Sequence, residues 1–422
     1  MSLILPIKFT LPFSAIFAAL SNFLLIMILA RQVPSEEYAR IINIKALILI
    51  LSSFFSLGLS QSYIHSFSKL ETSKAIENKQ LKLTVYLGII SSVIANCWIW
   101  YSGISLSHIL ISYFLITIIF IIYMINNELI NFLRASMRFS LVAYLTILRS
   151  FMLVATALIF LEYVNNHLAY LFSFLCTELI LLIPFSKFRN QGVNTSNFPV
   201  GYFKYGIVHG VIIAATFLFY YIDKLTISIS ANSLVRVTEY DLATILSVSL
   251  FGLLGRTFNV FLFPTLSSLK SLEFQLNNTF RKCLKVHSII SIIITVFLAY
   301  CTPLITQAIF KVDISVWNNT LIYGILGYHF LGACGLIATI MYVTGGTKNY
   351  LIAIVLSLAL YILLIVIQKI STQTINIFDI PKFLLISTGS CCLMLIFFNY
   401  RRLDVFSIAL LLLPIFLIRL NI

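Results

Sequence analysis

Charge is scarce in this sequence. Asp, Glu, Lys and Arg make up only 10% of the 422 residues, 60% are hydrophobic, and the mean hydropathy is +1.02. A water-soluble protein cannot bury that much apolar surface in one core. Runs of about 18 or more mostly apolar residues, long enough to cross a bilayer as helices, recur from end to end. The composition excludes a soluble globular domain and predicts an all-α polytopic membrane protein.

Motifs for catalysis and metal binding are missing as well. The sequence contains no Walker A motif, no DxD, no GxSxG and no HExxH. No polar segment is long enough to form an aqueous catalytic domain. The seven cysteines form no CxxC pair and no spacing with histidine, so they read as small side chains compatible with lipid: Cys97, Cys176, Cys283, Cys301, Cys334, Cys391 and Cys392. We expect a protein that is not an enzyme and that uses no cofactor or metal.

Acidic residues are few, and the formal net charge is +14. Nucleic-acid binding would need a basic patch on a folded face, whereas here Lys and Arg lie in short loops. Short cytoplasmic loops carry an excess of Lys and Arg, and alternate loops of this chain do so. The basic loop residues are Lys69, Lys74, Lys79, Lys82, Arg134, Arg138, Lys187, Arg189, Lys204, Lys270, Arg281, Lys282, Lys285, Lys348, Arg401 and Arg402. Their alternation predicts a cytoplasmic N-terminus.

Polar breaks divide the chain into twelve predicted transmembrane helices. They cover residues 11–30, 41–65, 83–103, 106–125, 141–162, 167–186, 203–229, 240–265, 286–310, 317–343, 350–368 and 381–398. The polar segment 187–199 is the clearest linker, so we predict a six-helix bundle over 1–190 and a second over 200–399. The hydrophobic tail 400–422 contains an apolar run, 405–420, that would be a thirteenth span or a helix lying on the membrane surface.

The two predicted bundles share a short pattern. Glu37-Tyr38 and Glu239-Tyr240 each stand just before a long apolar helix, at corresponding points 202 residues apart. Matching positions in both halves are what a parallel repeat of two bundles requires.

The pair Asp223-Lys224 lies in the outer part of the seventh predicted helix. Neighbouring residues on a helix point about 100° apart, so the two side chains cannot pair with each other. One interpretation is structural: Lys224 snorkels to the outer headgroups while Asp223 bonds a neighbouring helix. The other is that at least one lines a water-filled pathway, with Asp223 gating or coupling and Lys224 adding positive charge, because isolated ionisable groups are costly in lipid.

Two arginines are predicted on the cytoplasmic side of the membrane midplane, Arg149 in the fifth helix and Arg256 in the eighth. They come from different halves, so two facing bundles could present them across one cleft. Guanidinium groups bind phosphate in a forked geometry, which suits a diphosphate head. Hydrogen bonding to helix-end carbonyls is the structural alternative.

Glu178 in the sixth predicted helix and His329 in the tenth fall near mid-depth. A carboxylate or an imidazole there could titrate and couple proton movement to a conformational change. Interhelical hydrogen bonding is an equally good explanation for either residue.

The order of several short motifs resembles one family: the polysaccharide flippases of the multidrug/oligosaccharidyl-lipid/polysaccharide (MOP) exporter superfamily, including O-antigen translocases of the Wzx type. The matching stretches are "LARQVPSEEYARI", "LGLSQSYIHSFSK", "FLRASMRFSLVAYLTILRS", "YFKYGIVHG", "YYIDKLTIS", "EYDLATILSVSL" and "FLFPTLSSL". The resemblance covers nearly the whole chain. It departs at Lys224, where arginine is commoner, and in the thirteenth apolar run.

The resemblance implies a MATE-like fold of two six-helix bundles around a cleft that opens to alternate sides of a bacterial cytoplasmic (inner) membrane. Relatives flip undecaprenyl diphosphate-linked oligosaccharides, such as O-antigen or capsular repeat units, to the outer leaflet. Arg149, Arg256 and Lys224 would line a cationic cleft, and Asp223, Glu178 and His329 would couple or gate. Implied partners are the lipid-linked substrate, membrane lipids, H⁺ or Na⁺ as coupling ion, a polysaccharide polymerase and a chain-length regulator, with no nucleic acid.

Two other functions stay open. A multidrug or cation antiporter of the same superfamily would have this fold, but cationic drugs prefer acidic clefts, and this chain has more buried Arg and Lys than Asp and Glu. An O-antigen polymerase has a similar helix count, but such enzymes generally carry a large outer loop that this sequence does not predict.

Overall fold

The computed structural model forms two units, Met1–Leu218 and Phe219–Ile422. The division falls within one continuous helix, beyond the predicted linker at 187–199, which lies largely outside the described residues; the domain boundaries predicted from composition therefore stay a prediction. The structure describes residues 7–67, 74–101, 108–136, 138–187, 198, 201–230, 234–269, 272–399 and 402–418.

Twelve helices in the described residues are long and apolar enough to cross a membrane. This number agrees with the sequence prediction and makes the chain a multi-pass membrane protein. The apolar side chains that remain exposed on these helices, such as Leu110 and Ile370, suit contact with lipid.

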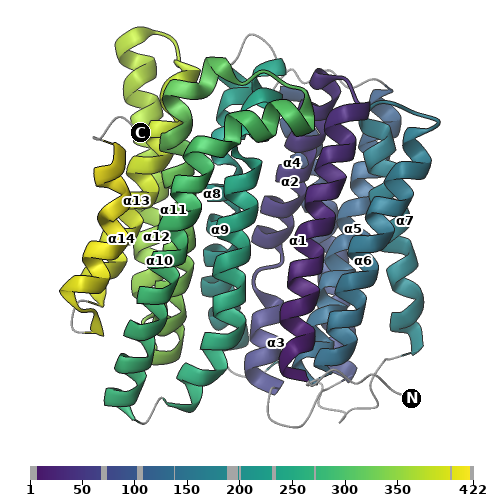
Figure 1. The fold of residues 1–422 in the computed structure, drawn as a ribbon. Helices are drawn as coiled ribbons and strands as arrows, with labels where there is room; N and C mark the ends of the chain where they lie inside the picture. Colours follow the sequence, from purple (N-terminus) through teal and green to yellow (C-terminus); the bar gives the residue numbers. More distant parts are fainter. Residues whose placement is uncertain are drawn as a thin grey trace. The chain divides into compact units, whose positions relative to one another are not determined.

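The described residues of unit 1 form seven complete helices and the first part of an eighth, and Figure 1 labels them. These are α1 (Ile7–Gln32), α2 (Ser35–Phe55), α3 (Leu59–Phe67), α4 (Lys74–Tyr101), α5 (Ile109–Ala135), α6 (Phe139–Leu161) and α7 (His167–Lys187), followed by α8 (Tyr202–Ser230). Helix α6 packs against α1 and α7, and α5 packs against α3, α4 and α7. Apolar side chains of α2, α4, α5 and α7 form one core, which includes Ile48, Ile99, Phe120 and Leu171. This packing fixes α5, α6 and α7 relative to one another.

The second predicted helix, 41–65, was expected to be continuous, but the structure breaks it between α2 and α3. Leu57 and Gly58 have left-handed backbone conformations, with φ of 48° and 59°. Gly58 lies directly against the backbone of α8: a Cβ built on it would be 2.0 Å from the carbonyl oxygen of Gly206 and 2.7 Å from the amide nitrogen of Gly210. Glycines one helical turn apart let two backbones approach this closely. The break is therefore set by backbone packing, which an apolar run does not reveal.

The described residues of unit 2 form the rest of α8 and six further α-helices. These are α9 (Val235–Ser268), α10 (Glu273–Ile305), α11 (Asn318–Thr344), α12 (Thr347–Thr372), α13 (Ile380–Phe398) and α14 (Val405–Ile418), with a π-helical turn at Thr306–Phe310. Helix α11 packs against α9, α10 and α13, and 83% of its most apolar stretch is buried. It is the central helix of this unit.

Several helix ends differ from the prediction because polar residues continue a helix instead of ending it. The fourth span was predicted at 106–125 but runs from Ile109 to Ala135, and the ninth was predicted at 286–310 but begins at Glu273. In α5 the extension includes Asn126 and Glu128, which are buried. Polar residues that bond inside a bundle do not break a helix, so counting polarity alone ended the span too early.

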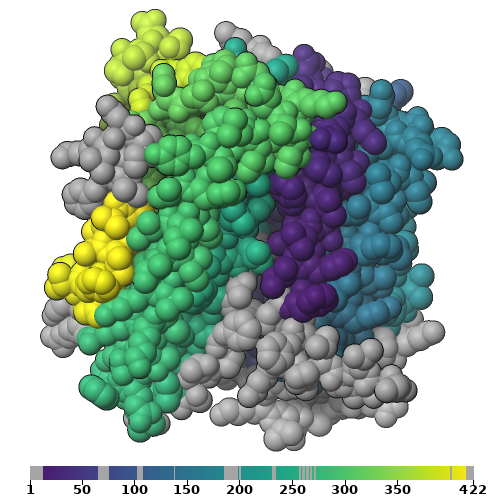
Figure 2. Space-filling view, in the orientation of Figure 1, coloured from purple at the N-terminus to yellow at the C-terminus, as the bar shows by residue number. Residues whose placement is uncertain are grey.

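The apolar run at the end of the chain forms α14, a helix of 14 residues. At about 1.5 Å per residue it is roughly 21 Å long, shorter than a hydrocarbon core of about 30 Å. It packs along α10 and α11, and Figure 2 shows it in yellow beside α10 in green. Within the described residues α14 is therefore a short docked helix.

Candidate functional site

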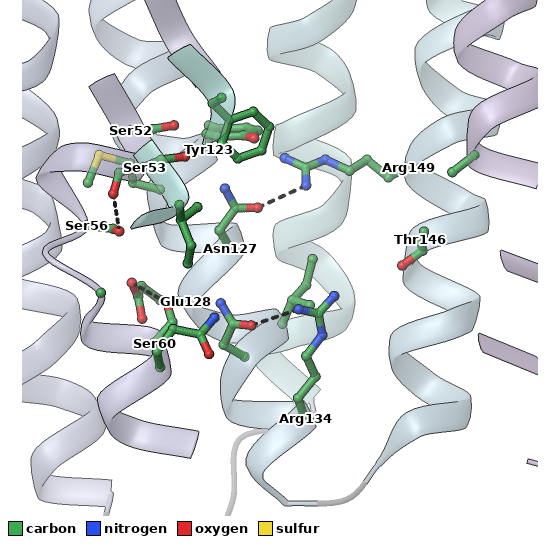
Figure 3. Close-up of a pocket in the computed structure, with 18 of the residues that line it drawn as sticks. Ser52, Ser53, Ser56, Ser60, Tyr123, Asn127, Glu128, Arg134, Thr146 and Arg149 are labelled. Atoms are coloured by element: carbon green, nitrogen blue, oxygen red, sulfur yellow. Dashed lines mark hydrogen bonds between the residues drawn. The ribbon is translucent and has the colours of Figure 1, made fainter. Parts of the chain in front are cut away.

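Unit 1 contains a polar cavity of about 400 Å³. Its walls come mainly from α2, α3, α5, α6 and α8, and Figure 3 shows the polar side chains pointing toward it. The charged residues among those that line it are Arg134, Arg149 and Glu128. The uncharged polar ones are Ser52, Ser53, Ser56, Ser60, Gln61, Tyr123, Asn127, Asn131, Thr146 and Ser150. Such a wall offers many hydrogen bonds to a charged or hydroxyl-rich ligand.

Arg149, on α6, is held in place from two sides. Its Nε donates to Glu178 Oε1 at 2.7 Å, and its Nη1 donates to Asn127 Oδ1 at 3.1 Å. The guanidinium also lies over the ring of Tyr123, 4.7 Å from the centroid. The side chain of Arg149 keeps 21% of its surface exposed, whereas that of Glu178 has none. The arginine therefore presents an oriented, partly paired guanidinium to the cavity.

The structure brings two predicted residues, Glu178 and Arg149, into one ion pair. Asn126 completes the arrangement, because its Nδ2 donates to Glu178 Oε2 and to the Glu178 carbonyl oxygen, both at 2.8 Å. Both carboxylate oxygens are therefore hydrogen-bonded, as a buried carboxylate requires. Glu178 balances the charge of Arg149 and fixes its orientation.

Arg134, in the last turn of α5, is the second arginine of the cavity wall. Its Nη1 donates to Asn131 Oδ1 at 3.2 Å (Figure 3). Asn127, Asn131 and Arg134 follow at intervals of four and three residues, which places them on one face of a helix. The sequence prediction assigned Arg134 to a loop, because it ended the helix at residue 125. The periodic spacing was the signal that could have identified this face.

Glu128 is a further residue that the sequence prediction missed. It is 1% exposed, and Ser60 Oγ donates to its Oε1 at 2.8 Å. Gln80 Nε2 donates to the other oxygen, Oε2, and Tyr202 OH in turn donates to Gln80 Oε1 at 2.6 Å. The network joins α3, α4, α5 and α8. The described partners of this carboxylate are neutral, in contrast to Glu178.

Asp223, on the unit 2 part of α8, is completely buried. Its Oδ2 accepts from Tyr240 OH at 2.8 Å and from Tyr328 OH at 2.7 Å. Its Oδ1 accepts from the backbone amide of Lys224 at 2.8 Å. The carboxylate thereby joins α8 to α9 and α11 within this unit.

Lys224 makes a different contact from its neighbour, as the 100° step along a helix predicts. Its Nζ lies 2.6 Å from Asp241 Oδ1 on α9, and both side chains are 1% exposed. The ammonium also lies 5.4 Å from the centroid of the Tyr221 ring. The charge of Lys224 is therefore balanced inside unit 2. The cleft-lining role of Lys224 stays a prediction.

The two remaining predicted residues are His329 and Arg256. His329 is buried and lies 2.7 Å through Nδ1 from Ser291 Oγ and 3.2 Å through Nε2 from the carbonyl oxygen of Leu411 on α14. It therefore bridges α10, α11 and α14. Arg256 belongs to α9, but its side chain lies outside the described residues. The coupling role of His329 and the cleft-lining role of Arg256 stay predictions.

No group of three or more His, Cys, Asp or Glu side chains within the described ranges is arranged to hold a metal ion.

No family model and no curated protein matches this sequence. Solved structures do match. The lipid II flippase MurJ, in an inward closed conformation, aligns with a TM-score of 0.68 and 16% identity over 98% of this chain and 92% of its own. A MATE protein in complex with MaD5 aligns with a TM-score of 0.66 and 12% identity over 96% of this chain and 95% of its own.

A third match is a MOP superfamily transporter from Pyrococcus furiosus, described as having a binding pocket of reverse polarity. Its TM-score is 0.64, with 13% identity over 96% of each chain. At these identities the likeness defines a fold and not a substrate. The chain has the all-helical, two-bundle fold of MOP superfamily transporters.

Proposed function

We propose that the protein is a flippase for a diphosphate-linked oligosaccharide lipid, such as an undecaprenyl diphosphate-linked O-antigen or capsular repeat unit. It moves this lipid from the inner to the outer leaflet of a bacterial cytoplasmic membrane by alternating access. The observation that carries the proposal is the cavity in unit 1, where Arg149 and Arg134 face a space of about 400 Å³. Two guanidinium groups suit two phosphates, because each has five N–H donors, and the described hydrogen bonds use two donors of Arg149 and one of Arg134.

The neutral part of the cavity wall supports the same class of substrate. Serine, threonine and asparagine side chains surround the arginines, and their hydroxyl and amide groups both donate and accept hydrogen bonds. A sugar offers hydroxyl groups of the same kind. The likeness in fold to a lipid II flippase is consistent with this substrate class.

The roles proposed for unit 2 rest on its buried charges. We propose that Asp223 couples or gates the conformational change. Its buried carboxylate accepts hydrogen bonds from two tyrosine hydroxyls, and a proton on the carboxylate would change these bonds between helices. We also propose the roles predicted from the sequence for four other residues. Coupling or gating is proposed for Glu178 and His329, and lining of a cationic cleft for Lys224 and Arg256. A polymerase and a chain-length regulator are proposed partners in the same membrane.

A multidrug or cation antiporter is the second candidate. The observation that favours it is the pair of buried carboxylates, Glu128 and Asp223, whose described side-chain hydrogen-bond donors are neutral. The fold is also shared with multidrug MATE transporters. The charged groups most exposed at the cavity wall, Arg134 and Arg149, argue against a cationic substrate, whereas Glu128 is 1% exposed.

Transport by the full-length protein in proteoliposomes tests the proposal. The substrate would be a fluorescent prenyl diphosphate-linked sugar, and the readout its arrival in the opposite leaflet. We expect Arg149→Ala and Arg134→Ala each to slow flipping by about 10- to 100-fold, the equivalent of one charge-assisted contact. Arg138→Ala removes an arginine outside the cavity wall and should leave the rate unchanged.

Because Arg149→Ala leaves Glu178 unpaired, the double variant Arg149→Met with Glu178→Gln separates charge from folding. It removes both charges together and should fold, yet it should flip as slowly as Arg149→Ala. Normal flipping by both this double variant and Arg134→Ala, or transport of organic cations in place of the lipid, would refute the proposal.

A further inference from the structure

The charges at the cavity of unit 1 cancel. Arg134 and Arg149 contribute two positive charges, while Glu128 at the wall and Glu178 directly behind Arg149 contribute two negative ones. A diphosphate diester brings about two negative charges of its own, one for each phosphate. An anion entering a cavity with no net charge must either leave negative charge uncompensated or recruit a cation.

Glu128 is the carboxylate best placed to take up that cation. Glu178 is held by the guanidinium of Arg149, so protonating it would sacrifice an ion pair. Glu128 is held by Ser60 and Gln80, which are neutral, and it lines the cavity. A proton added to Glu128 removes a negative charge next to the anion without breaking an ion pair.

The hydrogen bonds around Glu128 can accommodate the proton. Ser60 Oγ now donates to Oε1, but a hydroxyl can also accept. A proton on Oε1 can therefore be donated to Ser60 Oγ, after a rotation of that hydroxyl. Gln80 Nε2 continues to donate to Oε2, and Tyr202 continues to donate to Gln80 Oε1. Only one hydrogen bond reverses.

Several other titratable groups of the surrounding helices have partners of their own among the described residues. On α4, Glu77 accepts from Tyr63 OH of α3 at 2.6 Å. On α8, Tyr202 is bonded to Gln80. On α6 and α7, Arg149 and Glu178 form their own pair, and Arg134 of α5 bonds Asn131.

We infer that Glu128 takes up one proton from solution when an anionic diphosphate head binds in the cavity, so that H⁺ binds together with the substrate. The inference rests on the proposed function. It adds that the coupling ion is H⁺, that Glu128 binds it, and that ion and substrate bind together. In an antiporter for cations, proton and substrate would exclude each other. Here each strengthens the binding of the other, by the same factor in both directions.

Calorimetry on the purified full-length protein tests this inference. The probe is a short-chain prenyl diphosphate linked to one N-acetylhexosamine, a diester that does not titrate between about pH 6 and about pH 9. Binding heats in two buffers of different ionisation enthalpy give the number of protons taken up. We expect the wild type to take up close to one proton more than Glu128→Gln, and its affinity to fall up to about tenfold per pH unit as the pH rises.

Glu128→Gln should bind the probe with little dependence on pH, and more tightly than the wild type at the alkaline end. Glu77→Gln is the matched control, since it neutralises a buried acid of the adjacent helix that does not line the cavity; it should keep the wild-type pH slope. Equal proton uptake by wild type and Glu128→Gln throughout the range would overturn the inference. So would a Glu128→Gln variant that binds more weakly at every pH.

Infrared difference spectra of the wild type, probe-bound minus free, provide a second measurement if Glu128→Gln does not fold. The inference requires the carbonyl stretch of a protonated carboxyl group to appear on binding, and the absence of that band contradicts it.

Failure of the probe to bind the wild type, or binding that is unaffected by Arg149→Ala, would instead remove the proposed function itself. Binding that depends on Arg149 but moves no proton at Glu128 would remove only the inference.

Discussion

The two units of this protein each contain an ion pair and a buried carboxylate, and the surroundings of these groups differ. Each has one ion pair between consecutive helices, Arg149–Glu178 in unit 1 and Lys224–Asp241 in unit 2. Each also has a buried carboxylate whose described side-chain hydrogen-bond donors are neutral: Glu128 in unit 1 and Asp223 in unit 2. In unit 1 the arginine of the pair is 21% exposed beside a cavity, whereas both side chains of the pair in unit 2 are 1% exposed.

The second helix of each unit shows a related difference. In unit 1 it is broken between α2 and α3, and Ser60, just after the break, faces Glu128. In unit 2 the second helix, α9, is continuous over 34 residues, and Asp223 accepts hydrogen bonds from Tyr240 and Tyr328. The comparison teaches that similar charged groups have different surroundings in the two units: beside a cavity and a broken helix in unit 1, and enclosed between continuous helices in unit 2.

The largest effect should come from closing the break in unit 1. Gly58→Ala would place a Cβ 2.0 Å from the Gly206 carbonyl oxygen in a backbone conformation with φ of 59°. We expect a loss of more than about 4 kcal/mol of unfolding free energy, so that little folded protein is recovered. Gly201→Ala is the control, because Gly201 also has positive φ but no neighbouring atom within 4 Å; it should cost about 1–2 kcal/mol. Thermal unfolding in detergent measures both, and similar losses would contradict the role of backbone packing.

The enclosed ion pair should be next in magnitude. Lys224→Ala leaves Asp241 buried without its ammonium partner, which typically costs about 3–5 kcal/mol. The double variant Lys224→Met with Asp241→Asn removes both charges and should recover most of that loss. Chemical denaturation, monitored by tryptophan fluorescence, measures the unfolding free energy of both variants and of the wild type. If the double variant is less stable than Lys224→Ala, the charge balance does not explain the burial of Lys224.

The ion pair beside the cavity should matter less for stability. Arg149→Ala also leaves a carboxylate unpaired, but water in the cavity can approach the vacated position, so we expect a loss of about 1–3 kcal/mol. The same denaturation series measures it beside Lys224→Ala. A larger loss for Arg149→Ala than for Lys224→Ala would break the distinction drawn between the two units.

The smallest effect should come from the anchor of α14. Burial raises the pKa of Asp404, but hydrogen bonds from Ser407 and Lys285 outweigh it and lower the pKa to about 2 from an ordinary value of 3.8. A lowered pKa means that the stabilisation is present above about pH 4 and is lost as the pH falls toward 2. Both partners are about one-third exposed, so Asp404→Asn should cost at most about 1 kcal/mol.

Hydrogen exchange of the α14 amides checks this prediction. Protection in the wild type should decrease as the pH falls from about 4 to about 2, once the intrinsic exchange rate is corrected for. Asp404→Asn should show the reduced protection already at neutral pH. Asp313→Asn, a change in an exposed loop, should have no effect on α14.

The sequence was sufficient for the fold because its signals are local. Apolar runs of bilayer length predicted twelve spans, and the described residues contain twelve helices that are long and apolar enough to cross a membrane. Glu178 was also predicted to lie in the middle of its helix, and it does so in α7. What could not be predicted was which groups meet across helices: Asp241 as the partner of Lys224, and Asn126 as the partner of Glu178, depend on the register between packed helices.

Glu128 was missed for a different reason. Its helix was predicted to end at residue 125, because consecutive polar residues, Asn126 to Glu128, resemble a loop. In the structure these side chains find partners inside the bundle, and α5 continues to Ala135. Likewise, the break at Gly58 depends on the glycines of α8, more than 140 residues away in the sequence.

The length of α9 and α10 provides an experimental handle. The two helices pack against each other and contain 34 and 33 residues, about 50 Å each, while a hydrocarbon core is about 30 Å thick. Even when tilted, this hairpin should extend into water at the end where Arg281, Lys282 and Lys285 lie. An antibody fragment or a bulky thiol-reactive reagent directed to this hairpin would reach it from one side of the vesicle only. Its binding would therefore report the orientation of the reconstituted molecules.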